Sequence, residues 1–117
     1  MIDSAARTYV EAILASYRRL ADVATRPRPQ DRQLAVTLYL RGVPLTLVET
    51  ALALATARRR ARPPDALPLS PVRSLHYYLP VIDELLAQPP GDGYLDYLRD
   101  HLGHAAAGGR PENDVSG

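Results

Sequence analysis

The 117-residue sequence contains no cysteine, tryptophan, phenylalanine or lysine. Without cysteine there is no disulfide framework, no thiolate metal site and no cysteine nucleophile, which fits a reducing cytoplasm. No apolar run approaches the roughly 18 residues of a membrane span. The N-terminal segment carries Asp3, Arg7 and Glu11 where a secretory signal needs an uninterrupted apolar stretch. We therefore expect a cytoplasmic protein with no membrane contact.

The net charge is only +1, but the charges are unevenly distributed along the chain. Residues 1–64 hold eleven arginines against five acidic residues, a net charge of +6, and residues 65–117 hold three arginines against eight acidic residues, a net charge of −5. Such a chain either carries an anion-binding face or neutralises its two halves against each other in the fold. The exclusive use of arginine reflects either a GC-rich genome or recognition of phosphates and carboxylates.

Apolar residues recur at helical spacings along most of the chain. The spacing predicts five helices, over residues 3–24, 31–41, 44–60, 70–88 and 92–102. Asp31 is expected to cap the second helix, Gly42 to end it and Pro44 to start the third. Pro80 lies inside the fourth helix, and the unbroken apolar stripe on both sides of it favours one kinked helix over two. Asp92 is expected to cap the fifth helix and Gly103 to stop it.

The remaining segments separate these helices or follow the last of them. Residues 61–71 contain four prolines and are expected to form a loop. Residues 105–117 show no apolar period and are expected to be a disordered tail. The sequence thus predicts an all-α protein with one helical domain over residues 1–104, folded as a compact orthogonal bundle of about five helices.

Residues 31–60 are typical of a helix-turn-helix pair, because a tight glycine-centred turn joins two apolar-patterned helices. The second helix would have to present polar side chains near its start to read bases. Here it offers Leu45, Thr46 and Leu47. Direct sequence readout is therefore not expected, and contact with the nucleic-acid backbone is the better hypothesis.

The strongest candidate for a binding site is a run of four arginines at the end of the third helix, Arg58, Arg59, Arg60 and Arg62. The helix dipole favours one or two cations there and hardly accounts for four. We predict that they form an anion-binding face together with the arginines of the first helix and the first loop, Arg18, Arg19, Arg26 and Arg28. This face would bind nucleic-acid phosphates or an acidic protein partner.

The segment RSLHYYLPVIDELL contains a second candidate. A relay of Ser74 or Ser70 with His76 and Asp83 is conceivable, but proximity in sequence is weak evidence for such a relay. One interpretation is that the histidine and the neighbouring tyrosines border the core and bond the backbone that Pro80 frees. The other is a partner-binding surface. That surface would comprise Arg73, His76, Tyr77 and Tyr78.

Two histidines near the C-terminus, His101 and His104, lie on one helical face beside Asp96 and Asp100. A structural metal site needs further ligands that the sequence does not place nearby. Exposed histidines at a helix C-terminus, where they complement the dipole, are the simpler interpretation. We therefore predict no metal, no cofactor and no catalytic residue.

Two segments, LYLRGVPLTLVETALALATARRR and SPVRSLHYYLPVIDELL, together resemble small bacterial proteins associated with mobile elements and plasmid-type replication. Their order is also faintly similar to the helical domain of DnaD-like replication proteins, although the tryptophan-bearing end of that family's second helix is missing. The resemblance covers about residues 31–88 and transfers no functional residue. It implies a non-enzymatic accessory protein of DNA transactions. The alternative is a protein-interaction module or small subunit of a larger complex that contacts no nucleic acid.

Overall fold

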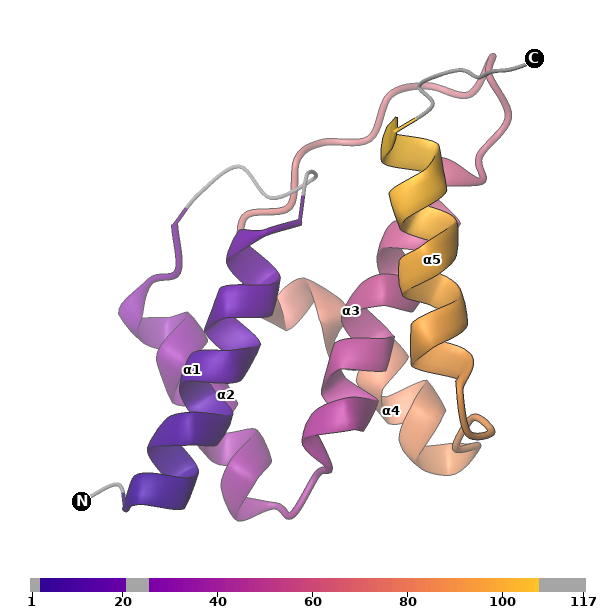
Figure 1. Cartoon of the computed structure of the whole chain (residues 1–117). Helices are drawn as coiled ribbons and strands as arrows, with labels where there is room; N and C mark the ends of the chain where they lie inside the picture. The colour runs from indigo at the N-terminus through magenta and orange to yellow at the C-terminus, as the bar shows by residue number, and fades with distance from the viewer. Residues whose placement is uncertain (1–2, 21–25, 108–117) are drawn as a thin grey trace.

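The computed structural model describes the backbone of residues 3–20 and 26–107, and the side chains of these residues up to residue 102. The described residues form five α-helices and one short 3-10 helix, with no β-strand. In chain order these are α1 (Ser4–Arg18), α2 (Pro29–Leu40), α3 (Leu45–Arg60), η1 (Leu75–Tyr78), α4 (Leu79–Ala87) and α5 (Tyr94–Ala107) (Figure 1). The expected all-α bundle is confirmed. None of these helices has the length and apolarity that crossing a membrane requires.

The helices are arranged around α3. Helices α1 and α2 run antiparallel beside each other, and α3, which follows the turn at 41–44, packs against α1 (Figure 1). Helix α3 also contacts η1, α4 and α5. The long loop 61–74 leaves the end of α3 and crosses back to the side of α1 and α2 before η1 begins (Figure 1). This loop therefore connects the two sides of the bundle.

Helix α3 is the central element of the core. Every side chain from Thr50 to Thr56 is buried, so this stretch is enclosed on all sides. The Thr50 and Thr56 hydroxyls donate to carbonyl oxygens one turn back, at 2.6 and 2.8 Å, so their polar groups are satisfied within the helix. Because it is enclosed, the middle of α3 is closed to a DNA groove, although α2, the turn and α3 form the expected helix-turn-helix-like pair.

The turn between α2 and α3 follows from Gly42. Its φ of +77° lies in the left-handed region, which a residue without a Cβ adopts at little cost. The Val43 N–H then donates back to the Leu38 carbonyl at 3.1 Å, which closes the end of α2. The Tyr9 hydroxyl of α1 donates to the Val43 carbonyl at 2.7 Å and fixes the turn against α1.

Several predicted boundaries differ from the structure. Helix α1 ends at Arg18 rather than at residue 24, and residues 21–25 lie outside the described part of the chain. Helix α2 begins at Pro29, two residues before the predicted cap. Asp31 occupies the third helical position, and its carboxylate accepts a hydrogen bond from the Arg28 N–H at 2.8 Å. Asp31 thus reaches back to the start of the helix from inside its first turn.

The fifth helix also begins and ends later than predicted. Its first residue is Tyr94, so Asp92 does not occupy the predicted cap position. Gly93, which precedes the helix, has a φ of +84°. It continues through Gly103 to Ala107. Residues 105–107 are therefore helical, contrary to the predicted tail, and the rest of that tail, 108–117, lies outside the described residues.

The fourth helix is shorter than predicted, because residues 70–74 are not helical. The Ser74 hydroxyl caps η1 by accepting from the His76 N–H at 3.1 Å. Pro80 has no N–H to donate to the His76 carbonyl, which accepts from the Leu79 N–H in a 3-10 pattern instead. Helix α4 then starts at Leu79 with Pro80 in its first turn, where no internal hydrogen bond is lost. The proline therefore sets the junction between two helix types.

Candidate anion-binding surface

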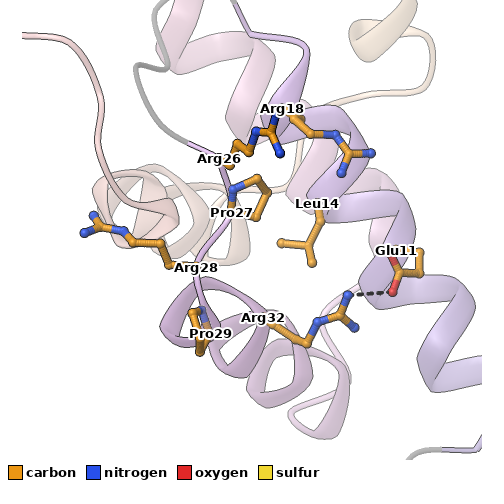
Figure 2. A pocket seen from close by; sticks show the side chains of 8 residues that line it. All are labelled: Glu11, Leu14, Arg18, Arg26, Pro27, Arg28, Pro29 and Arg32. Atoms are coloured by element: carbon orange, nitrogen blue, oxygen red, sulfur yellow. Dashed lines mark hydrogen bonds and ion pairs between the residues drawn. The ribbon is translucent and has the colours of Figure 1, made fainter.

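Most of the predicted arginines fall into two groups, which differ in what their side chains contact. One group donates hydrogen bonds to its own chain. The other group surrounds a hollow at one end of the α1–α2 pair (Figure 2). The two groups are built by different parts of the fold, and we describe them in turn.

Three arginine side chains donate to backbone carbonyls of the loop 61–74. Arg59 donates to the Ser70 carbonyl at 2.8 Å and Arg62 to the Leu67 carbonyl at 2.7 Å. Arg28, at the start of α2, donates to the Arg73 carbonyl at 2.5 Å. The loop is rich in proline, which has no N–H, so side-chain donors satisfy carbonyls that the loop's own backbone leaves available.

Arg58 binds α4 instead of the loop. Its guanidinium donates two hydrogen bonds to the Glu84 carboxylate, at 2.9 and 2.6 Å. These bonds lower the pKa of Glu84 below its ordinary value and raise that of Arg58. Both side chains are about half exposed, so solvent screens the pair. We call the four chain-bound side chains the tether arginines: Arg28, Arg58, Arg59 and Arg62.

The second group surrounds a hollow of about 480 Å³ between the end of α1 and the start of α2. Leu14 and Pro27 provide apolar surface in it (Figure 2). We call the three cations around it the rim arginines: Arg18, Arg26 and Arg32. All three are exposed. Arg28 also borders the hollow, but its guanidinium extends away from it (Figure 2).

The rim arginines differ in whether their guanidinium groups bind another residue of the chain. Arg32 donates to the Glu11 carboxylate at 2.7 Å, in a pair whose side chains are about half exposed. Arg18 and Arg26 make no hydrogen bond or ion pair with any other described residue, and their guanidinium groups lie on the same side of the hollow (Figure 2). Two cations here are therefore available to an anion, and the third is held by a weak, solvent-screened pair.

A buried carboxylate fixes the position of this hollow. Asp31 is 0% exposed and accepts the Arg28 N–H at 2.8 Å, the Leu75 N–H at 2.9 Å and the Ser74 hydroxyl at 3.3 Å. It thus joins the first turn of α2 to the start of η1. Hydrogen bonds to an ionised acceptor are stronger than neutral ones. Asp31 therefore sets where the arginines of α2 lie relative to the loop.

Arg19 and Arg60 lie apart from the hollow. Arg19 lines a smaller depression with Glu49 and Arg99. Arg60 makes a long contact of 3.5 Å with the Leu102 carbonyl of α5. The eight predicted arginines therefore do not form one continuous face, and Arg32, which the sequence analysis did not select, joins the group at the hollow.

The predicted partner-binding residues are also divided by the fold. Arg73, His76 and Tyr77 are exposed. Tyr78 is 0% exposed, and its ring packs edge-to-face against Tyr17 with centroids 6.1 Å apart. Tyr78 is a core residue, so its assignment to a partner surface was wrong.

Ser74 and His76 lie close together but are not arranged as a catalytic relay. The Ser74 oxygen is 3.0 Å from His76 Nδ1 and 3.3 Å from the Asp31 carboxylate. In a triad the histidine lies between the hydroxyl and the carboxylate. Here the hydroxyl lies between them and also caps η1. Asp83, the predicted carboxylate, is exposed on α4 and makes no hydrogen bond to His76.

In the part of the chain with described side chains, no three His, Asp or Glu residues lie close enough together to hold a metal ion. The His104 side chain lies outside that part. His101 stacks on Tyr97, with ring centroids 6.2 Å apart. No family model, curated protein or solved structure matches the chain. The resemblance to mobile-element and DnaD-like proteins therefore stays a prediction.

Proposed function

We propose that this chain is a non-enzymatic accessory protein of DNA transactions, and that it binds nucleic-acid backbone through the rim arginines. The observation that carries the proposal is the hollow itself. Arg18 and Arg26 present guanidinium groups on one side of it with no partner in the described chain. A guanidinium forms bidentate, charge-assisted hydrogen bonds with phosphate oxygens.

The proposed binding is independent of base sequence. Helix α3, which would be the recognition helix of a helix-turn-helix protein, is enclosed by the rest of the bundle from Thr50 to Thr56. A protein without a free recognition helix binds mainly through phosphate contacts, which position it without reading bases. The apolar surface of Pro27 beside the cations would adjoin the sugar of a bound strand.

The cellular setting is part of the same proposal and has a narrower basis. A role in bacterial mobile elements or replication rests on the resemblance of residues 31–88. A cytoplasmic location rests on the absence of cysteine. The role in mobile elements or replication and the cytoplasmic location are both compatible with a nucleic-acid-binding function.

The proposal is tested by fluorescence-anisotropy titration of single-stranded and duplex DNA and RNA. Three phosphate contacts, one for each rim arginine, predict a loss of roughly 40-fold in affinity between about 50 and 200 mM salt. A double variant, Arg18→Ala with Arg26→Ala, removes about two of these contacts. We expect it to bind more weakly at low salt and to lose only about 3-fold to 4-fold over the same salt range.

The matched control is Arg7→Ala with Arg41→Ala. It removes the same charge from two exposed arginines at the opposite end of the α1–α2 pair (Figure 1). We expect this control to retain the wild-type salt slope. Absence of binding by the wild type at low salt, or an equal loss in both double variants, would contradict the proposed site.

The second candidate function is a protein-interaction module that contacts no nucleic acid. The observation in its favour is the occupation of Arg58, Arg59 and Arg62 by contacts within the chain. These contacts hold the densest part of the predicted basic face against the loop and α4, so fewer of its N–H groups remain for phosphate. In this second function, an acidic partner protein would bind where these three arginines lie beside exposed apolar side chains.

A further inference from the structure

A second hollow, of about 470 Å³, lies between the end of α3, the loop 61–74 and the start of α4. Its apolar part comes from three elements: Ala55 of α3, Leu69 of the loop and Val81 of α4. Tyr77 of η1 and Pro80 complete this surface. We call this hollow the α3–α4 groove. It is separate from the hollow of the rim arginines and shares no residue with it.

Large apolar side chains remain accessible in the groove. Leu69 is 44% exposed and Tyr77 is 45% exposed. The Tyr77 ring is held in place, because Arg59 lies over it at 5.4 Å and donates to its hydroxyl at 3.0 Å. An immobilised aromatic ring loses little entropy when a partner covers it, which favours its use as an anchor in an interface.

The charged residues that line the groove are all arginines: Arg58, Arg59 and Arg62. Each already donates to its own chain, but a guanidinium has five N–H groups, so donors remain for a second acceptor. A basic segment would be repelled by the positive charge at these edges, although Glu84 offsets part of the charge of Arg58. A segment with acidic residues beside its apolar ones would be attracted to this positive charge.

We propose that the α3–α4 groove binds an acidic amphipathic helical segment of a partner protein. The apolar residues of the segment, three and four apart, would cover Leu69, Tyr77 and Val81. Its Asp and Glu residues would pair with the groove arginines. This is the helix-in-groove mode of recognition, in which apolar anchors supply affinity and flanking charges supply selectivity. The proposal is independent of nucleic-acid binding at the rim arginines.

The proposal is tested by selecting random 16-residue peptides, displayed on phage, for binding to the full chain. The variant Leu69→Asp is used for counter-selection, because it places a negative charge in the groove at a half-exposed loop position. Leu40→Asp is the matched control, since Leu40 is 76% exposed on α2 and outside the groove. Thermal melts of both variants establish that they remain folded.

We expect the enriched peptides to carry Asp or Glu beside apolar residues at helical spacing. Measured by anisotropy, they should bind the wild type and Leu40→Asp equally and Leu69→Asp at least about 10-fold more weakly. No enrichment over Leu69→Asp, enrichment of basic peptides, or equal loss in both variants would overturn the proposal. Displacement of a bound peptide by DNA on a chain carrying Arg18→Ala and Arg26→Ala would also overturn it, because the groove would then be a nucleic-acid site.

Discussion

The tether arginines and the rim arginines are the same residue type on the same small bundle, yet all four tether arginines donate to their own chain and, among the described residues, only one of the three rim arginines, Arg32, does so. Arg59 and Arg62 donate to carbonyls of a proline-rich loop, and Arg58 pairs with Glu84. Arg18 and Arg26 lie beside a hollow and contact no other described residue through a hydrogen bond or ion pair. The difference comes from what lies opposite each side chain rather than from its position in a charge cluster.

This comparison changes how the charge pattern is interpreted. Four arginines within five residues indicated an anion-binding cluster. The loop that follows them supplies acceptors to Arg59 and Arg62, and Arg58 pairs with Glu84 of α4. The rim arginines lie at the end of α1, in the segment before α2 and in α2 itself, and they come together because α1 and α2 are antiparallel. The predictions below test this separation, from the largest expected effect to the smallest.

Asp31→Ala is expected to be the most damaging substitution, because Asp31 positions α2 relative to η1 and so fixes both arginine groups. It would leave the Arg28 and Leu75 N–H groups without their acceptor. We expect a loss of about 2–4 kcal/mol in the free energy of unfolding, measured by urea denaturation. Asp83→Ala, at an exposed position on α4, is the control and should change it by less than about 0.5 kcal/mol. A similarly small change for Asp31→Ala would disprove its role.

Arg59→Ala tests the tether arginines directly. It removes the hydrogen bond to the Ser70 carbonyl and the contact with Tyr77. We expect limited proteolysis to cleave the loop 61–74 about 10-fold faster, because local opening costs about 1.4 kcal/mol less. Arg18→Ala should leave this cleavage rate unchanged. Equal effects of the two substitutions would remove the distinction between the groups.

Tyr9→Phe probes the α1–α2 pair at the end remote from the hollow. Burial raises the pKa of Tyr9 from 10.0 to about 12, so the folded state favours the protonated hydroxyl that donates to Val43. This contribution is fully present below about pH 10 and is lost as the pH rises toward 12. Arginine stays charged throughout that range. Urea denaturation should show a smaller alkaline loss of stability for Tyr9→Phe than for the wild type, and identical losses would contradict the assignment.

The Arg58–Glu84 pair should give the smallest effect, because both side chains are about half exposed. Arg58 lowers the pKa of Glu84, so the pair stabilises the fold above the ordinary pKa of a glutamate. Its contribution is lost as the pH falls through the lowered value. A double-mutant cycle with Arg58→Ala and Glu84→Ala should show weak coupling at pH 7 and less at acidic pH. Coupling that increases on acidification would contradict this.

Much of the fold could be predicted from the sequence, because helical spacing, Gly42 and the proline-rich loop are local signals. Boundaries that depend on distant groups could not. Asp31 lies inside the first turn of α2, where its carboxylate accepts from the Arg28 N–H and also from the distant Leu75 N–H. The start of η1 involves Ser74 and Pro80 together. The burial of α3 on all sides had a signal in the run from Thr50 to Thr56, where apolar and small residues leave no polar face.

The candidate site was less predictable than the fold. Arg18 and Arg26 were selected with six other arginines, and nothing in the sequence distinguished those that bind their own chain. Arg32 was missed although it lies four residues after Arg28, on the same side of α2. Tyr78 was assigned to the surface because adjacent tyrosines look alike in sequence, whereas only Tyr77 is exposed. These distinctions depend on tertiary contacts.

The most direct test of the central claim compares two double variants in one nucleic-acid titration at about 50 mM salt. One carries Arg18→Ala and Arg26→Ala, the other Arg58→Ala and Arg59→Ala, so each loses the same charge. The account predicts that the first loses about 10-fold or more in affinity and that the second stays within about twofold of the wild type. The reverse order would show that the tether arginines are the binding surface and would contradict the account.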